Sequence, residues 1–195
     1  MKKENENEKV QSKVEKTVEH KDKKDVTPEE KLNNIIKKAK EKGIHTVIDT
    51  AGGPFTRKEP FFSKFQELMK YTDLLLVDIK HIDNKYHKVL TGRSNENILD
   101  MIRYLSDIKK PIWIRHVLVP ERSDKDEYLT RLADFIHSLD NVEKVEILPY
   151  HTLGVHKYEA MEQEYKLKDV KENTPEQLEK ATEVFKKYFT TVVVN

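Results

Sequence analysis

Short apolar segments alternate with helical segments along most of this chain, and that order restricts the folds open to it. A helix is predicted after Thr27, where Thr-Pro-Glu-Glu supplies an N-cap, a first-turn proline and the glutamate of a capping box, and it ends at Gly43. The further expected helices are 60–70, 96–108 capped by Ser94 or Asn95, a Ser123-capped helix through 139, and one opened by Thr174. The expected strands are 45–50, 74–80, 112–119, 142–148 and 191–194. Alternation of this kind predicts an α/β fold with a parallel sheet.

Several of these strands are continuous apolar runs, such as Leu-Leu-Leu-Val at 74–77. Runs of that kind are typical of parallel strands covered on both faces. In such sheets, whether open or closed into a barrel, ligands lie beyond the carboxyl ends of the strands, because the loops converge there. Polar residues at or near the strand ends are therefore the candidates for a binding site.

Asp49 and Thr50 close the first predicted strand and precede a Gly-Gly-Pro turn that would let the backbone approach a ligand closely. Taken alone, they are better explained as ordinary turn residues. Asp78 and Lys80 are two apart on the next strand, so their side chains share one face. A mutual ion pair and a site for a zwitterionic amino acid explain this pair equally well.

Arg115 interrupts the apolar strand 112–119, and His151 follows the strand 142–148. A charged residue inside an apolar run needs a partner, so the structural interpretation of Arg115 is a buried ion pair. An isolated histidine in a loop is usually a surface residue, and the spacing of His151 to His156 matches no strong metal motif. The functional interpretation depends on the whole set lying at one edge of the sheet.

The amino-acid composition limits the classes of function that this chain could have. The 36 basic and 35 acidic residues leave a formal charge of +1, which predicts neither nucleic-acid nor membrane binding. No apolar run approaches the ~20 residues of a membrane span, and we expect a cytoplasmic protein. Residues 1–25 are almost wholly polar, so we expect a disordered charged leader followed by one domain over 26–195. The chain has no cysteine, which excludes thiolate metal ligands and a cysteine nucleophile in these 195 residues.

Several motifs together resemble one family. They are Gly43-Ile44-His45-Thr46 leading to Asp49-Thr50, Leu75-Leu76-Val77-Asp78-Ile79-Lys80, Leu90-Thr91-Gly92, Trp113-Ile114-Arg115 with Val119-Pro120, and Val142-Glu143-Lys144-Val145-Glu146-Ile147-Leu148-Pro149-Tyr150-His151. In order and spacing, residues 28–195 resemble the central and C-terminal part of the pyruvate formate-lyase activating enzymes, a radical S-adenosylmethionine (SAM) family of glycyl-radical-enzyme activators.

The resemblance implies an incomplete parallel (β/α) barrel of radical SAM type. It implies SAM and a [4Fe-4S] cluster as cofactors, and pyruvate formate-lyase as the partner on which a glycyl radical is made. Lys80 would then hold the methionine carboxylate and His151 the nucleoside, while Asp49, Thr50 and Asp78 would place the methionine end. A monovalent cation at Asp49 and Asp78 is also implied. The resemblance would put Arg115 near the substrate peptide and the loop 150–171 against the partner.

The family's Cys-x-x-x-Cys-x-x-Cys loop has no counterpart here, because the chain has no cysteine. Without thiolate ligands this chain cannot hold the cluster, so we expect no catalytic residue in it and no activity of the chain alone. Three interpretations stay open: a truncated enzyme, one half of a split enzyme whose cluster-bearing N-terminal fragment pairs with an exposed edge at 45–50, and a non-catalytic module that binds SAM or a partner. A rival outside the family is a TIM-barrel-like enzyme with Asp78 and Lys80 as an acid-base or Schiff-base pair.

Overall fold

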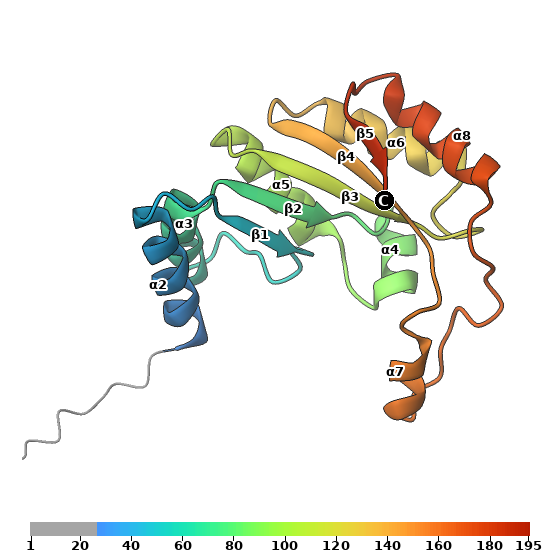
Figure 1. The fold of residues 1–195 in the computed structure, drawn as a ribbon, viewed down its shortest axis with the longest axis horizontal. Coiled ribbons are helices and arrows are strands. Elements are labelled where there is room, and N and C mark those ends of the chain that lie inside the picture. Colours follow the sequence, from blue (N-terminus) through green and yellow to red (C-terminus); the bar gives the residue numbers. More distant parts are fainter. Residues whose placement is uncertain (1–26) are drawn as a thin grey trace, which may run out of the picture. The chain divides into compact units, whose positions relative to one another are not determined.

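The computed structural model describes residues 27–195, so the expected leader over residues 1–25 lies outside the described residues. The strands are β1 (Val47–Thr50), β2 (Leu74–Asp78), β3 (Ile112–Leu118), β4 (Val142–Pro149) and β5 (Val192–Val194). The helices are α2 (Pro28–Glu41), α3 (Phe61–Tyr71), α4 (Asn84–Thr91), α5 (Glu96–Asp107), α6 (Asp126–His137), α7 (Val155–Ala160) and α8 (Pro175–Lys186). All five expected strands are present, each in the expected place (Figure 1).

The five strands form one sheet in the order β1-β2-β3-β4-β5, and every neighbouring pair is parallel. Because strand order follows chain order, each connection moves one place along the sheet, as in a (β/α) barrel. In the described part of the chain, β1 and β5 are the two edges of this sheet. The fold is therefore the expected α/β class, an incomplete parallel barrel.

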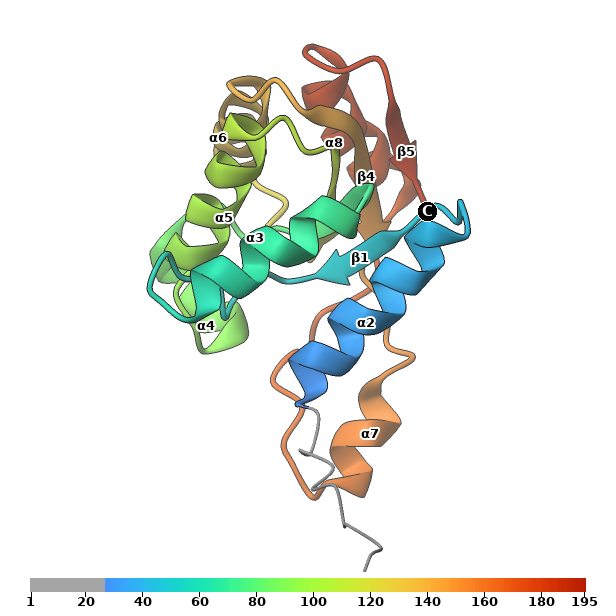
Figure 2. The ribbon, with the colours of Figure 1, turned by 90° about the vertical axis from the view of Figure 1, so that its left-hand side faces the viewer.

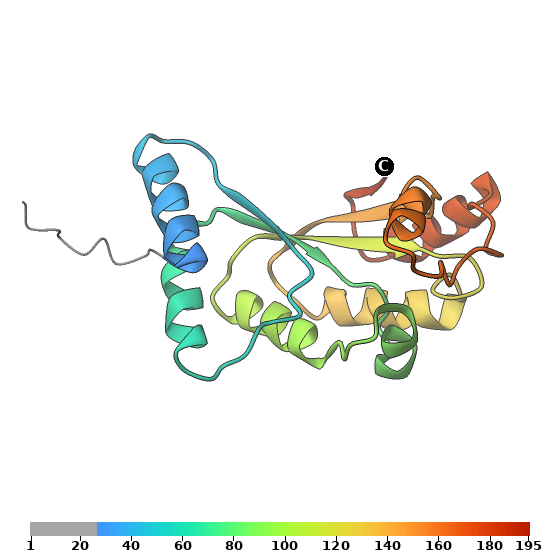
Figure 3. The same ribbon diagram turned by 90° about the horizontal axis from the view of Figure 1, so that it is seen from below.

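One face of the sheet is buried under helices. Along β3, Ile112, Ile114, His116 and Leu118 are buried, while the residues between them stay partly exposed. The buried face packs on α5, α6 and α8 through side chains such as Ile102, Leu132 and Phe185, which are 0–1% exposed. Figures 2 and 3 show α5 and α6 side by side on that face.

The expectation of strands covered on both faces is wrong for β3, which alternates where a doubly covered strand would be buried throughout, but it holds in the middle of β4, where Val145, Glu146 and Ile147 are all buried. The other face, which we call the open face, carries Leu76 and Asp78 on β2 and Trp113 and Arg115 on β3, all partly exposed. Polar side chains can occupy this face without the cost of full burial.

Helix starts follow the sequence signals at some positions and depart from them at others. Thr27 and Glu30 form the reciprocal bonds of a capping box, and Thr174 with Gln177 does the same for α8. The Ser123 cap of α6 is wrong, because α6 begins after Lys125. Ser123 instead accepts a bond from the Val119 N–H and donates to the Val117 carbonyl, which closes the turn after β3.

Helices α4 and α7 were not predicted. Helix α4 is amphipathic, begins with Asp83 accepting bonds from the N–H groups of Lys85 and Tyr86, and ends at Gly92 in the left-handed conformation at φ 74°. Helix α7 has six residues and no buried side chain. Both were hidden by short length and by the weak apolar periodicity of short segments. In the part of the chain that the structure describes, no helix is long and apolar enough to cross a bilayer.

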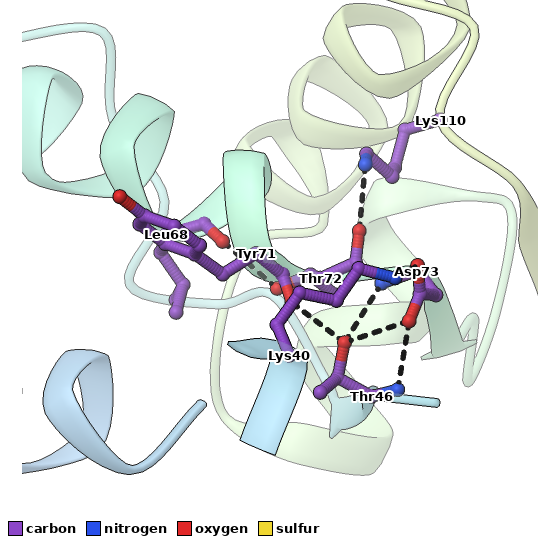
Figure 4. A network of polar contacts seen from close by, with 7 residues as sticks. All are labelled: Lys40, Thr46, Leu68, Tyr71, Thr72, Asp73 and Lys110. Carbon is purple, nitrogen blue, oxygen red and sulfur yellow. Dashed lines mark hydrogen bonds and ion pairs between the residues drawn. The ribbon is translucent and has the colours of Figure 1, made fainter. Parts of the chain in front are cut away.

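A polar network joins the starts of β1 and β2 (Figure 4). Asp73 accepts a bond from the Thr46 N–H at 2.9 Å, its Oδ2 lies 3.0 Å from the Thr46 hydroxyl oxygen, and it pairs with Lys40. The Thr46 hydroxyl donates to the Tyr71 carbonyl at 2.6 Å, and Lys110 donates to the Thr72 carbonyl at 2.6 Å. The Lys40 ammonium and then the Thr46 amide hold the pKa of Asp73 far below its usual range.

We predict that Asp73→Ala lowers the free energy of unfolding by about 2 kcal/mol, since charge-assisted bonds that tie two strands are lost. Urea unfolding followed by circular dichroism measures the change. Glu183→Ala, which removes an exposed carboxylate on α8, serves as the control and should change stability by less than about 0.5 kcal/mol. Equal stability of the two variants would contradict a clamping role for Asp73.

Candidate functional site

Four charged residues form one connected network on the open face: three lie on β1, β2 and β3, and Lys80 follows the end of β2 by two residues. Asp78, the last residue of β2, pairs in register with Arg115 on β3. The Arg115 Nε donates to Asp78 Oδ1 at 3.0 Å, and its Nη2 donates to Asp49 Oδ1 on β1 at 2.9 Å. The Lys80 ammonium lies 2.8 Å from the second oxygen of Asp78. The sheet thus brings together Asp49, Asp78, Lys80 and Arg115.

The parallel register explains why Arg115 belongs to this site although it does not end its strand. Strand β3 continues three residues beyond Arg115, to Leu118, whereas β2 ends at the residue that pairs with it. Arg115 therefore lies inside β3, as its place within the predicted strand 112–119 indicated. Its interpretation as a partner in an ion pair is confirmed.

The network balances two cations against two anions. Burial acts to lower the pKa of Arg115, but the hydrogen bond and charge of Asp78, with a contribution from Asp49, outweigh burial and raise it. The side chains of Asp78 and Arg115 are 13% and 20% exposed, whereas those of Lys80 and Asp49 are 33% and 57% exposed. The centre of the network is structural, and its two ends face solvent.

Those two ends have unused bonding capacity. An ammonium has three donors, and the described residues occupy one of the donors of Lys80 through Asp78. The Oδ2 atom of Asp49 accepts no hydrogen bond from the part of the chain that the structure describes. A ligand with its own carboxylate and ammonium could therefore meet both groups without breaking the pairs already present.

The open face carries a second polar group that the sequence interpretation missed. Glu146 on β4 lies opposite Arg115 in register and is 5% exposed. Its Oε1 accepts bonds from Lys144 at 2.6 Å and from the Asn195 side chain at 2.9 Å. The Lys144 ammonium lies 4.3 Å from the centre of the Trp113 ring. The alternation of Lys144 and Glu146 with Val145 and Ile147 was the available signal.

Thr50 and His151 are not joined to the network by any hydrogen bond or ion pair within residues 27–195. The Thr50 hydroxyl accepts a bond from the Gly52 N–H at 3.0 Å. His151 is exposed and lines a hollow beyond the ends of β3 and β4, together with Val117, Leu148 and Asn195. These two residues lie at the carboxyl edge of the sheet, but only a ligand could link them to the network.

The glycine turn after β1 packs against α5 at Gly52. Gly52 has φ +65°, and a Cβ there would lie 2.5 Å from the terminal carbon of Met101 on α5. The residue is required by its left-handed conformation and by that helix contact. This packing holds the loop that follows Asp49 against the buried side of the fold.

Three histidines beside the site are almost completely buried: His81, His87 and His116, at 1–2% exposure. His81 Nδ1 accepts a bond from the Asp83 N–H, and His116 Nδ1 bonds the Ile79 carbonyl at 2.7 Å. In each of the three, the Nε2 atom has no partner among residues 27–195. Burial lowers the pKa of His81, and it lowers the pKa of His116 to about 4. Both histidines are therefore neutral near pH 7.

Comparison with known proteins identifies the class. The sequence model of the radical SAM superfamily matches residues 19–133, and the chain belongs to that superfamily. More particularly, it is 53% identical over 139 residues to the pyruvate formate-lyase-activating enzyme of Staphylococcus aureus (strain USA300). The aligned part is 71% of this chain and 55% of the relative, so the chain spans about half the length of the curated relatives it matches.

Solved structures show the same fold. A domain of pyruvate-formate lyase-activating enzyme from Bacteroides vulgatus superposes with a TM-score of 0.68 at 23% identity, covering 86% of this chain and 91% of that one. Streptococcus suis SuiB bound to S-adenosylmethionine superposes with a TM-score of 0.60 at 19% identity, covering 84% of this chain and 36% of that one. The incomplete barrel of radical SAM type is confirmed.

The superfamily implies SAM and a [4Fe-4S] cluster, and the two fit these residues differently. The free donors of Lys80 and the free oxygen of Asp49 suit the amino-acid end of SAM. The cluster does not fit, because the chain has no cysteine and no group of three or more potential ligands gathers within residues 27–195. No step through a cluster can be assigned to this chain's own residues.

The buried neutral histidines predict acid sensitivity. In the unfolded chain His116 binds a proton below its ordinary pKa of 6.5, whereas in the folded chain it stays neutral down to about pH 4. The free energy of unfolding therefore falls as the pH drops from 6.5 to 4. Each such proton contributes a slope of about 1.4 kcal/mol per pH unit. In His116→Asn, the amide can replace Nδ1 toward Ile79, and the slope of unfolding free energy against pH should fall by the contribution of about one proton. Urea unfolding at several pH values between 4 and 7 measures it, and an unchanged slope would contradict the assignment.

Proposed function

We propose that this chain is the SAM-binding and partner-binding part of a glycyl-radical-enzyme activator of the pyruvate formate-lyase-activating type, and that alone it binds SAM without cleaving it. The observation that carries the proposal is the Asp49–Arg115–Asp78–Lys80 network, with its free donors and free carboxylate oxygen. The 53% identity to the S. aureus activating enzyme supports the choice of activator type.

The residues have distinct proposed roles. Lys80 binds the methionine carboxylate through its free donors, and Asp49 accepts the methionine ammonium or a monovalent cation shared with Asp78. Arg115 bonds both aspartates and fixes their positions, and it lies near the position proposed for the substrate peptide. SAM supplies an activated sulfonium when bound, but these residues only bind and orient it.

Thr50 and His151 complete the proposed SAM site. The Thr50 hydroxyl already accepts from Gly52 and keeps its own proton to donate. The imidazole of His151 is exposed beyond the end of β4, where it can stack on or hydrogen-bond the nucleoside. Both roles need a ligand that reaches along the carboxyl edge of the sheet from β1 to β4.

The proposed partner is pyruvate formate-lyase, with the loop 150–171 as a contact surface. A split enzyme is an alternative, because β1 is an edge strand among the described residues and its Val47 is 46% exposed. A cluster-bearing fragment could add parallel strands there. A non-catalytic binding module is the other alternative, and the proposed SAM and partner contacts are common to both.

We predict that SAM binding depends on Lys80. In isothermal titration calorimetry, Lys80→Met should raise the SAM dissociation constant at least tenfold, equivalent to about 1.4 kcal/mol, because the carboxylate loses its cation. Lys64→Met, which removes an exposed ammonium on α3, is the matched control and should bind SAM as the parent chain does. A parent chain that fails to bind SAM, or a Lys80 variant that binds it unchanged, would refute the proposed site.

We predict that anaerobic reconstitution with ferrous iron and sulfide leaves no bound iron on this chain after desalting, since it offers no thiolate. Iron content measured by a colorimetric assay checks this. Stable binding of about four irons per chain would overturn the assignment. Formation of a stable, iron-containing complex only after mixing with a cluster-bearing fragment of a related activator would favour the split enzyme over the non-catalytic module.

A further inference from the structure

A continuous groove runs between α4 and the chain that follows β4. Three adjoining hollows share their walls: the first two have Val89, Leu90 and Arg122 in common, and the first and third share Tyr158, Gln163, Tyr165 and Leu167. We call the whole feature the α4–α7 groove. Its two sides come from segments distant in sequence, and Figure 1 shows α4 and α7 beyond the arrowheads of the central strands.

The walls of the α4–α7 groove expose large apolar and aromatic side chains. Val89 is 65% exposed on α4, Tyr86 is 39% exposed beside it, and Tyr158 on the opposite side is 38% exposed. Side chains of this size on one continuous surface are typical of an interaction site rather than of ordinary solvent-facing residues. The groove therefore favours a ligand that can bury apolar groups.

The groove is built on fixed aromatic contacts. On the α7 side, the Tyr150 and Tyr165 hydroxyls bond at 2.6 Å, and the Tyr165 ring meets that of Tyr158 edge-on with centroids 5.0 Å apart. On the α4 side, the Tyr86 and Tyr128 rings lie 5.1 Å apart, and Tyr128 packs on buried His81 at 4.5 Å. Walls held in this way are preorganised, which lowers the entropic cost of binding.

Positive charge predominates along the first two hollows. Lys88, Arg122, Lys125 and Lys166 line them, and none of the four forms an ion pair within the described part of the chain. The acidic groups there are Glu121 and Glu164, and Glu164 is already paired with Lys168 at 3.3 Å. The charge of the groove is thus complementary to carboxylates.

We propose that the α4–α7 groove binds an extended acidic peptide segment of a partner protein, whose apolar side chains enter beside Val89, Leu90 and Tyr158 while its carboxylates meet Arg122 and Lys88. An extended peptide suits a row of connected hollows because its side chains alternate along the backbone. A nucleic acid suits it less, since the chain carries a net charge of only +1 and the groove walls include apolar side chains such as Val89 and Leu90, which a phosphate backbone would not bury. The proposal deepens, and rests on, the partner contact proposed above, but it does not depend on SAM binding.

Surface plasmon resonance on the intact immobilised chain tests the proposal with three synthetic peptides. The first alternates glutamate with phenylalanine and leucine, the second replaces its glutamates by lysine, and the third replaces its apolar residues by alanine. We expect binding of the first alone, with an affinity that falls as salt rises. Equal binding of the lysine peptide, or preferential capture of anionic vesicles or of a DNA oligonucleotide, would overturn the proposal.

Charge-reversal variants locate the contact. Arg122→Glu and Lys88→Glu should each weaken binding of the acidic peptide at least tenfold, and Val89→Asp should do the same through the apolar wall. Lys64→Glu makes the same charge reversal at an exposed position on α3 and should bind the peptide as the parent chain does. An affinity for the acidic peptide that is unchanged in all three groove variants would refute this location.

Calorimetry with SAM on the same variants separates this proposal from the proposed function. Arg122→Glu should keep SAM binding, and Lys80→Met should keep peptide binding. If the parent chain binds SAM and pyruvate formate-lyase but not the acidic peptide, the proposed peptide groove is refuted and the proposed SAM site is not. If the parent chain binds the acidic peptide but not SAM, the proposed SAM site is refuted and the proposed groove is not.

Discussion

The guanidinium of Arg115 is the interaction on which the open face depends. It bonds carboxylates on two neighbouring strands and lies in register with a third carboxylate, that of Glu146. Without it, Asp49 and Asp78 would face one another across a partly buried sheet with Lys80 as their nearest cation, and like charges so placed are costly. The planar, forked guanidinium can meet two carboxylates at once, which an ammonium at the same position could not do with the same geometry.

The two faces of the sheet have different roles. Residues such as Ile114 and Ile147 bury one face against helices and supply the apolar core, while the alternate residues leave polar groups on the other face. At the amino ends of the strands, Asp73 and Thr46 tie β1 to β2, and at the carboxyl ends lie the charged groups proposed to bind SAM. Stability and ligand binding are thus placed at opposite ends of the same strands, as in other parallel α/β proteins.

The fold was largely predictable because its strands are strongly apolar and its helices are marked by caps such as Thr27 and Thr174. The site was predictable in part: Asp49, Asp78, Lys80 and Arg115 do meet, since parallel strands align their carboxyl ends. What escaped prediction depends on register and on tertiary packing. The register that pairs Asp78 with Arg115 and the contact of Gly52 with Met101 could not be inferred from the sequence. The absence of cysteine, by contrast, excludes thiolate ligands and a cysteine nucleophile from these 195 residues whatever their fold.

The single tryptophan of the chain, Trp113, lies on the open face two residues before Arg115, with the Lys144 ammonium over its ring. Indole emission responds to nearby charge and to the polarity of its surroundings. The indole fluorescence of the unmodified chain, which selective excitation separates from that of its tyrosines, therefore arises next to the charged network. A molecule that settles on this face changes the colour or intensity of that emission, so the protein carries its own optical probe at the place where its function is proposed to lie.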